Sequence, residues 1–200
     1  MEAIIIGDII NSREVEPNEW MPALKKVLNK YGKEPKSWEI FRGDSFQLNT
    51  SPEDALQAAI LLKAEIKQWK ALDVRIGIGI GEITYHAAKI TESNGTAFLN
   101  SGMCFEQLKK QTLAIKTSEK EFDKTLNLMF NLAELTMEKW TETAAKLITY
   151  KIGNPNANQK ELAQILNKTG QGTISEGLKR GGYDEIEKLL AYYKLKIKEL

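Results

Sequence analysis

The segment over residues 74–81 (VRIGIGIG) constrains the fold most strongly, because isoleucine and glycine alternate along it. A period of two predicts a β-strand with two different faces. One face carries isoleucines, and the other, at Gly77, Gly79 and Gly81, carries no side chains. Either a ligand or a helix must then approach the strand backbone closely. Tight packing of a helix is the favoured interpretation.

The remaining elements are predicted from periodicity and from turn and cap residues. Apart from Asp8, residues 3–9 are apolar and rich in isoleucine, which is typical of a strand buried on both faces. Ser51 and Pro52 form a strong helix start. The other expected elements are helices over about 17–31, 98–110 and 119–150, a hairpin over 38–49 around a Gly-Asp turn, and a strand over 113–115. Strands and helices in this order predict an α+β fold.

The breaker at residues 153–156 (GNPN) marks a domain boundary. We therefore expect a first domain over residues 1–118, a long connecting or dimerisation helix over 119–153, and a small all-α domain over 154–200. The apolar stripe of the long helix includes Met129, Met137 and Trp140. Such a stripe suits either a helical core or a seam with a second copy of the chain. A homodimer is the expected assembly.

Two acidic residues, Asp8 and Asp44, stand at a strand end and in the hairpin turn. If the first strand lies beside the hairpin, the two carboxylates converge, and their repulsion is relieved by a divalent cation between them. Mg²⁺, or Mn²⁺ in its place, suits such oxygen ligands, and the backbone carbonyl of Ile9 would complete the set. The alternative is that both acids are structural, because Asp beside Gly is common in turns.

Four motifs together resemble the core motifs of class III nucleotide cyclases. They are residues 6–9 (IGDI), 41–46 (FRGDSF), 74–81 (VRIGIGIG) and 95–100 (GTAFLN). The hairpin also resembles the signature turn of diguanylate cyclases. The resemblance covers roughly residues 1–117 and implies a ferredoxin-like palm sheet with packed helices. It also implies that Gly43 and Asn100 contact a nucleotide.

Two departures from the cyclase pattern bear on catalysis. The position of the family's transition-state arginine is Cys104, and that of its adenine-selecting lysine is Ile40. Cyclisation needs a cation to stabilise charge on the transferring phosphate. Arg42 and Arg75 are alternative donors, and the sequence favours neither. The chain is therefore expected to be a degenerate, non-enzymatic palm, and the alternative is a Mg²⁺- or Mn²⁺-dependent nucleotidyl cyclase or related nucleotidyltransferase.

The last forty-odd residues predict a helix-turn-helix. Residues 159–166 form a short amphipathic helix, and residues 172–180 form a second helix held by Ile174 and Leu178. The side chains expected to contact DNA are those of Gln159, Lys160, Thr173, Ser175, Lys179 and Arg180. The alternative is a plain three-helix packing module.

A cyclase-like palm followed by this tail resembles the SatD-like family of bacterial regulators. The similar tail segments are residues 159–163 (QKELA), 174–175 and 178–180. The resemblance implies a DNA-binding transcriptional regulator whose palm has a metal or nucleotide ligand or serves dimerisation. An interaction module in which neither site is active is a third possibility.

The net charge is +1, so any DNA binding must come from a local patch. The single cysteine cannot form an intramolecular disulfide, and no apolar stretch is long enough to span a bilayer. A cytoplasmic protein without membrane contact is expected.

Overall fold

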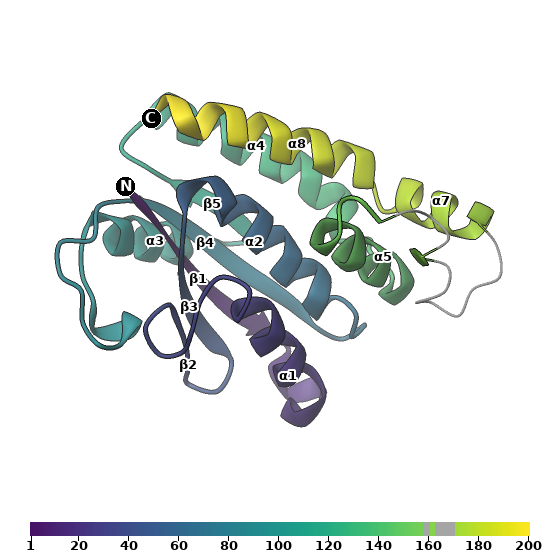
Figure 1. Cartoon of the computed structure of the whole chain (residues 1–200), viewed down its shortest axis with the longest axis horizontal. Coiled ribbons are helices and arrows are strands. Elements are labelled where there is room, and N and C mark those ends of the chain that lie inside the picture. Colours follow the sequence, from purple (N-terminus) through teal and green to yellow (C-terminus); the bar gives the residue numbers. More distant parts are fainter. Residues whose placement is uncertain (158–160, 163–170) are drawn as a thin grey trace.

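The structure, a computed structural model, describes residues 1–157, 161–162 and 171–200. Within these residues the chain is a mixed α+β protein with one five-stranded sheet and seven α-helices (Figure 1). No helix in the described part of the chain has the length and apolar character needed to cross a membrane.

The sheet has the strand order β2-β3-β1-β4-β5. Its strands are β1 (Glu2–Ile10), β2 (Trp38–Phe41), β3 (Ser45–Thr50), β4 (Asp73–Gly81) and β5 (Leu113–Lys116). The central strand β1 runs antiparallel to both β3 and β4, whereas β5 runs parallel to β4. The predicted first strand, hairpin and alternating strand are all confirmed.

The two faces of the sheet are covered by different helices. The helices before the fourth strand are α1 (Pro17–Leu28) and α2 (Pro52–Ile66), and α3 (Thr96–Gln107) follows it. Helix α2 packs on β1 and β4 with α1 beside it, and Ser51 caps α2 by accepting a hydrogen bond from the backbone N–H of Asp54 at 3.2 Å. The isoleucines of β4 join these helices in the main hydrophobic core.

The glycine face of β4 lies directly against α3. A Cβ atom on Gly79 would stand 2.1 Å from the backbone nitrogen of Ser101 and 2.3 Å from the carbonyl oxygen of Ala97. Gly77 and Gly81 meet the backbone of the same helix in the same way. Tight helix packing therefore explains the alternating pattern, as favoured from the sequence.

The prediction of one continuous helix over residues 119–153 is wrong. The structure has two helices, α4 (Lys120–Met137) and α5 (Glu142–Gly153). Thr141 starts the second helix by accepting a hydrogen bond from the backbone N–H of Ala144 at 3.2 Å. The indole Nε1 of Trp140 donates to the carbonyl oxygen of Gly181 at 2.8 Å. Because Met137 and Trp140 are buried in the chain's own core, they are unavailable as a dimer seam.

Two further helices follow the breaker, α7 (Gln171–Arg180) and α8 (Tyr183–Lys196). Three short 3₁₀ turns complete the described elements, at Ser12–Glu14, Ile90–Glu92 and Ile197–Glu199. Helix α7 packs on α5, whereas α8 lies along α2 and α4 (Figure 1). The hydroxyl of buried Tyr193 donates to the carbonyl oxygen of Pro52 at 2.6 Å. The last helix of the predicted 154–200 domain thus shares the core of the sheet and is not a detached module.

Candidate functional site

An open pocket of about 550 Å³ lies where β1 ends. Its lining residues are Asp8, Ile9, Ile10, Asn11, Ser12, Arg13, Glu14, Asp44 and Arg75. The three predicted metal ligands, Asp8, Ile9 and Asp44, therefore line one pocket although they come from distant parts of the sequence. Metal binding by them stays a prediction.

Asp8 is placed by the register of the sheet. It pairs across the ladder with Ser45 of β3 on one side and with Arg75 of β4 on the other. Its Oδ1 accepts a hydrogen bond from the Ser45 hydroxyl at 3.0 Å, and its Oδ2 accepts one from Arg75 Nη2 at 2.9 Å. The carboxylate is thus held between a neutral donor and a cation before any ligand binds.

Asp44 is placed by the hairpin turn. The turn uses left-handed backbone conformations at Arg42 (φ 56°) and Gly43 (φ 91°). The carbonyl oxygen of Asp44 accepts from the backbone N–H of Ile9 at 3.1 Å, and its Oδ2 accepts from the Ser12 hydroxyl at 2.6 Å. These bonds tie the turn to the end of β1. Among the residues that the structure describes, no hydrogen bond to Oδ1 of Asp44 is found, and Asp44 itself lines the pocket.

Arg75 is the cation that the sequence left undecided. Its side chain is 37% exposed, and its guanidinium lies 5.3 Å from the centre of the Phe105 ring. It combines an ion pair with Asp8 and a cation–π contact, and part of it remains open to the pocket. Arg42, the other candidate, lies in the exposed turn and is not among the pocket residues.

The donor set fits Mg²⁺ or Mn²⁺ held by two carboxylates with further oxygens from water or phosphate. The described residues contain no group of three or more His, Cys, Asp and Glu side chains suited to a metal, so the remaining ligands would be backbone, water or phosphate oxygens. Metal binding by both oxygens of Asp8 requires a change in the pocket. Arg75 must give up Oδ2 of Asp8 before both oxygens of that carboxylate are available.

The structure does not bring the two predicted nucleotide-binding residues, Gly43 and Asn100, close to each other. Gly43 belongs to the turn beside the pocket, whereas Asn100 lies on α3 and donates from Nδ2 to the carbonyl oxygen of Ile80 at 2.8 Å. Ile80 pairs with Ala3, five positions along β1 from Asp8. At about 3.4 Å per residue this is about 17 Å along the strand. Asn100 therefore stands at the opposite end of the sheet from the acids.

Cys104, the residue at the position where the cyclase pattern predicts an arginine, is buried. Burial raises the pKa of its thiol to about 12, so the thiol is neutral at physiological pH. It lies on the glycine face of β4, where the neighbouring Phe105 meets Gly77. This side chain supplies no cation to the pocket.

The described part of the predicted DNA-binding tail presents one buried and one exposed face. Ile174 and Leu162 are buried together with Leu147 of α5. Ser175, Lys179 and Arg180 are exposed, and Arg180 forms an ion pair with Glu176. A Cβ atom on Gly177 would lie 2.5 Å from Leu147 Cδ1, so this glycine allows α7 to approach α5 closely. Gln159, Lys160 and the side chain of Thr173 lie outside what the structure describes.

Sequence reasoning did not identify Ser12 and Ser45 as partners of the two acids. Ser12 stands in no motif and Ser45 has no assigned role in the motif at residues 41–46, and the roles of both serines depend on which strands are neighbours. The only available signal was the alternation of β4, which puts Arg75 on the same face as the glycines. The alternation shows which face of β4 carries Arg75, but it does not show which residue of a neighbouring strand Arg75 contacts.

Comparison with family models decides the relationship. The model of the SatD family matches residues 3–184. The chain belongs to the SatD family. In this SatD-family protein the matched range includes nearly all of the sheet, the residues that line the pocket, and α7. No match is found among curated proteins.

Proposed function

We propose that this SatD-family protein is a non-enzymatic regulator with a palm related to nucleotide cyclases. The order of its elements, β1-α1-β2-β3-α2-β4, together with the strand order β2-β3-β1-β4, supports a ferredoxin-like palm. In this proposal the pocket at the end of β1 binds Mg²⁺ or Mn²⁺ together with a nucleotide phosphate, and α7 contacts DNA.

The observation that carries the ligand proposal is the meeting of Asp8 and Asp44 at one open pocket beside Arg75. Two carboxylates favour a cation, and a guanidinium favours a phosphate. A metal–nucleotide complex presents both charges at once. Asp8 and Asp44 would hold the cation, which would neutralise the phosphate charge, and Arg75 would contact a phosphate oxygen.

Binding without turnover is the better-supported form of the proposal. Transition-state charge in phosphoryl transfer needs positioned cations. At the site where the cyclase pattern has arginine, this chain has a buried neutral thiol. Asn100 lies at the far end of the sheet.

Calorimetric titration of the full chain with Mg²⁺ or Mn²⁺, in the presence and absence of ATP and GTP, tests the ligand proposal. We expect saturable binding that Asp44→Asn reduces at least about tenfold, because a ligand oxygen loses its charge. Asp184→Asn is the matched control, since Asp184 is exposed on α8 outside the pocket. Equal loss of binding in both variants, or none in wild type, would contradict the proposal.

The alternative activity, nucleotide cyclisation, is favoured by one observation, the presence of a guanidinium at the pocket. It predicts a cyclic product from ATP or GTP with Mn²⁺, detected by chromatography, that disappears in Asp44→Ala. Product formation that survives in this variant would exclude the two-carboxylate mechanism.

DNA contact through α7 is supported by the division of that helix into a buried face and an exposed polar face. Lys179 and Arg180 would contact phosphates or guanine edges. Gel shifts with genomic fragments at low salt test this part. We expect weaker binding for the double variant Lys179→Ala, Arg180→Ala, but unchanged binding for Lys109→Ala, Lys110→Ala, an exposed basic pair elsewhere in the chain. Equal effects of the two double variants would argue for nonspecific charge.

A further inference from the structure

Helix α4 has a second apolar stripe that points away from the protein. On its inner face, Leu126, Phe130 and Met137 are each at most 1% exposed. On the outer face Leu128, Leu132 and Leu135 are each 60–61% exposed. Isolated exposed leucines are ordinary, but three in a row on one helix mark a surface for association.

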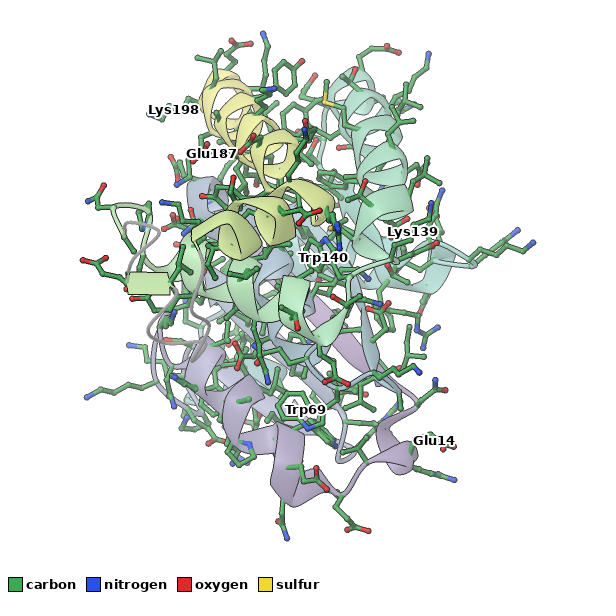
Figure 2. All side chains as sticks on the ribbon, turned by 90° about the vertical axis from the view of Figure 1, so that its right-hand side faces the viewer. Glu14, Trp69, Lys139, Trp140, Glu187 and Lys198 are labelled. Atoms are coloured by element: carbon green, nitrogen blue, oxygen red, sulfur yellow. The ribbon has the colours of Figure 1, made fainter. Side chains whose placement is uncertain are left out.

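The outer stripe follows a heptad spacing. Its positions are Glu121, Thr125, Leu128, Leu132 and Leu135 on α4 and Lys139 two residues beyond the end of that helix, separated by steps of four and three residues, and all six are exposed. This is the a and d spacing by which two helices pack along a common seam. Figure 2 shows Lys139 just past the end of α4. We call these six residues the outer seam.

The charges at the two ends of the outer seam favour a second copy of the same chain as the partner, with its helix antiparallel. Glu121 and Lys139 each stand nine residues from position 130, and Leu128 and Leu132 each stand two residues from it. A two-fold axis at this position makes the seam self-complementary. It opposes each Glu121 to Lys139 of the other helix, and each Leu128 to Leu132. A parallel pair would instead oppose like charges at both ends.

A groove beside the seam enlarges the apolar surface. It has a volume of about 570 Å³ and lies between α4 and α8, where its apolar lining includes Leu132, Ala133, Ile186 and Leu189. Leucine side chains of an apposed helix would fill such a groove. The contact is then wider than a single row of side chains.

We propose that the outer seam of α4 pairs antiparallel with the outer seam of a second copy of this chain, forming a two-fold symmetric dimer. The pairing depends neither on metal binding nor on DNA binding. It also places the dimer contact on the face opposite the buried Met137. Because the seam is short, we expect a dissociation constant on the order of micromolar.

Sedimentation equilibrium of the full chain across a concentration series tests the pairing. We expect dimer formation in wild type and at least about a tenfold larger dissociation constant for Leu132→Glu, since a charge at the seam centre is desolvated in both copies. Leu195→Glu is the matched control, because Leu195 on α8 is equally exposed at 61% and lies outside the seam. A monomer at all concentrations, or a dimer that Leu132→Glu does not weaken, would overturn the proposal.

A charge exchange tests the direction of the helices. Glu121→Lys and Lys139→Glu are each expected to weaken the dimer about twofold to tenfold, since two equivalent exposed pairs become repulsive. The double variant is expected to recover wild-type affinity, because the opposite charges face each other again. In a parallel pair the double variant keeps like charges opposed. Failure of the double variant to recover affinity would overturn the antiparallel arrangement.

Discussion

At one end of the sheet, where β1 ends, Asp8, Asp44 and Arg75 surround an open pocket and are held by side-chain hydrogen bonds. Towards the other end, Gly79 and Gly81 let the backbone of α3 lie directly on β4. Side chains in an open pocket exchange a protein partner for a ligand at small cost. Backbone atoms in contact cannot move apart without losing packing. We therefore expect ligand binding at the first end and a contribution to stability at the second.

The largest expected effect concerns access to Cys104, which is buried on the glycine face of β4. Because burial raises its pKa to about 12, little thiolate forms near pH 8, and we expect a thiol reagent such as DTNB to react on the order of 100-fold more slowly with the folded chain than with the unfolded chain. Release of the coloured product with and without guanidinium measures this. Rapid labelling of the native protein would show that the Cys104 thiol is accessible from solvent.

A side chain added at the closed end should destabilise the fold. Gly79→Ala places a methyl group about 2 Å from the backbone of α3, and overpacking of this kind costs about 2–3 kcal/mol in the free energy of unfolding. Denaturant unfolding provides the measurement. Gly102→Ala is the control, since a Cβ there meets nothing within 4 Å, and alanine in a helix is favoured by about 1 kcal/mol. Similar values for both variants would remove the special role of the glycine face.

At the open end, removal of Arg75 should change two affinities in opposite directions. Arg75→Met frees Oδ2 of Asp8, so Mg²⁺ or Mn²⁺ alone should bind several-fold more tightly. A nucleotide with the metal should bind up to about tenfold more weakly, because its phosphate loses a charged partner. Calorimetric titration with the metal alone, and with the metal and a nucleotide together, measures the two affinities. A change of the same sign for both would show that Arg75 acts only as a structural partner of Asp8.

The smallest expected effect is at the bond between Ser12 and Asp44. Ser12→Ala removes a 2.6 Å hydrogen bond and should lower the free energy of unfolding by about 1 kcal/mol, with metal affinity falling a few-fold. Thermal unfolding and calorimetry check it against Ser118→Ala, a change at an exposed serine. No difference between the two variants would mean that Ser12 does not position the acid.

The sequence predicted the strands and turns of the sheet well, because each of these elements is determined by residues that are neighbours in the chain. The period of two in β4, the Gly-Asp turn and the Ser51 cap each depend on a few neighbouring residues. The break between α4 and α5 was missed, since Thr141 lies within an otherwise continuous helical pattern. Its cap is reinforced by Trp140, whose partner Gly181 is 41 residues away.

The candidate site was predicted in part for the same reason. The two acids stood out at a strand end and a turn, and the strand order brings them to one pocket. Asn100 was grouped with them through motif order alone, and the antiparallel direction of β1 and β4 places it at the far end.

The sequence by itself determined which segments become strands and helices, and which acids stand at their ends, because these depend on periodicity, turns and caps. Only the tertiary structure decided that Arg75 pairs with Asp8, that α8 joins the core, and that Leu132 faces outward from α4. Each of these depends on strand register or on which helix face finds a partner. Two apolar stripes on one helix look alike in sequence, and packing buries only one of them.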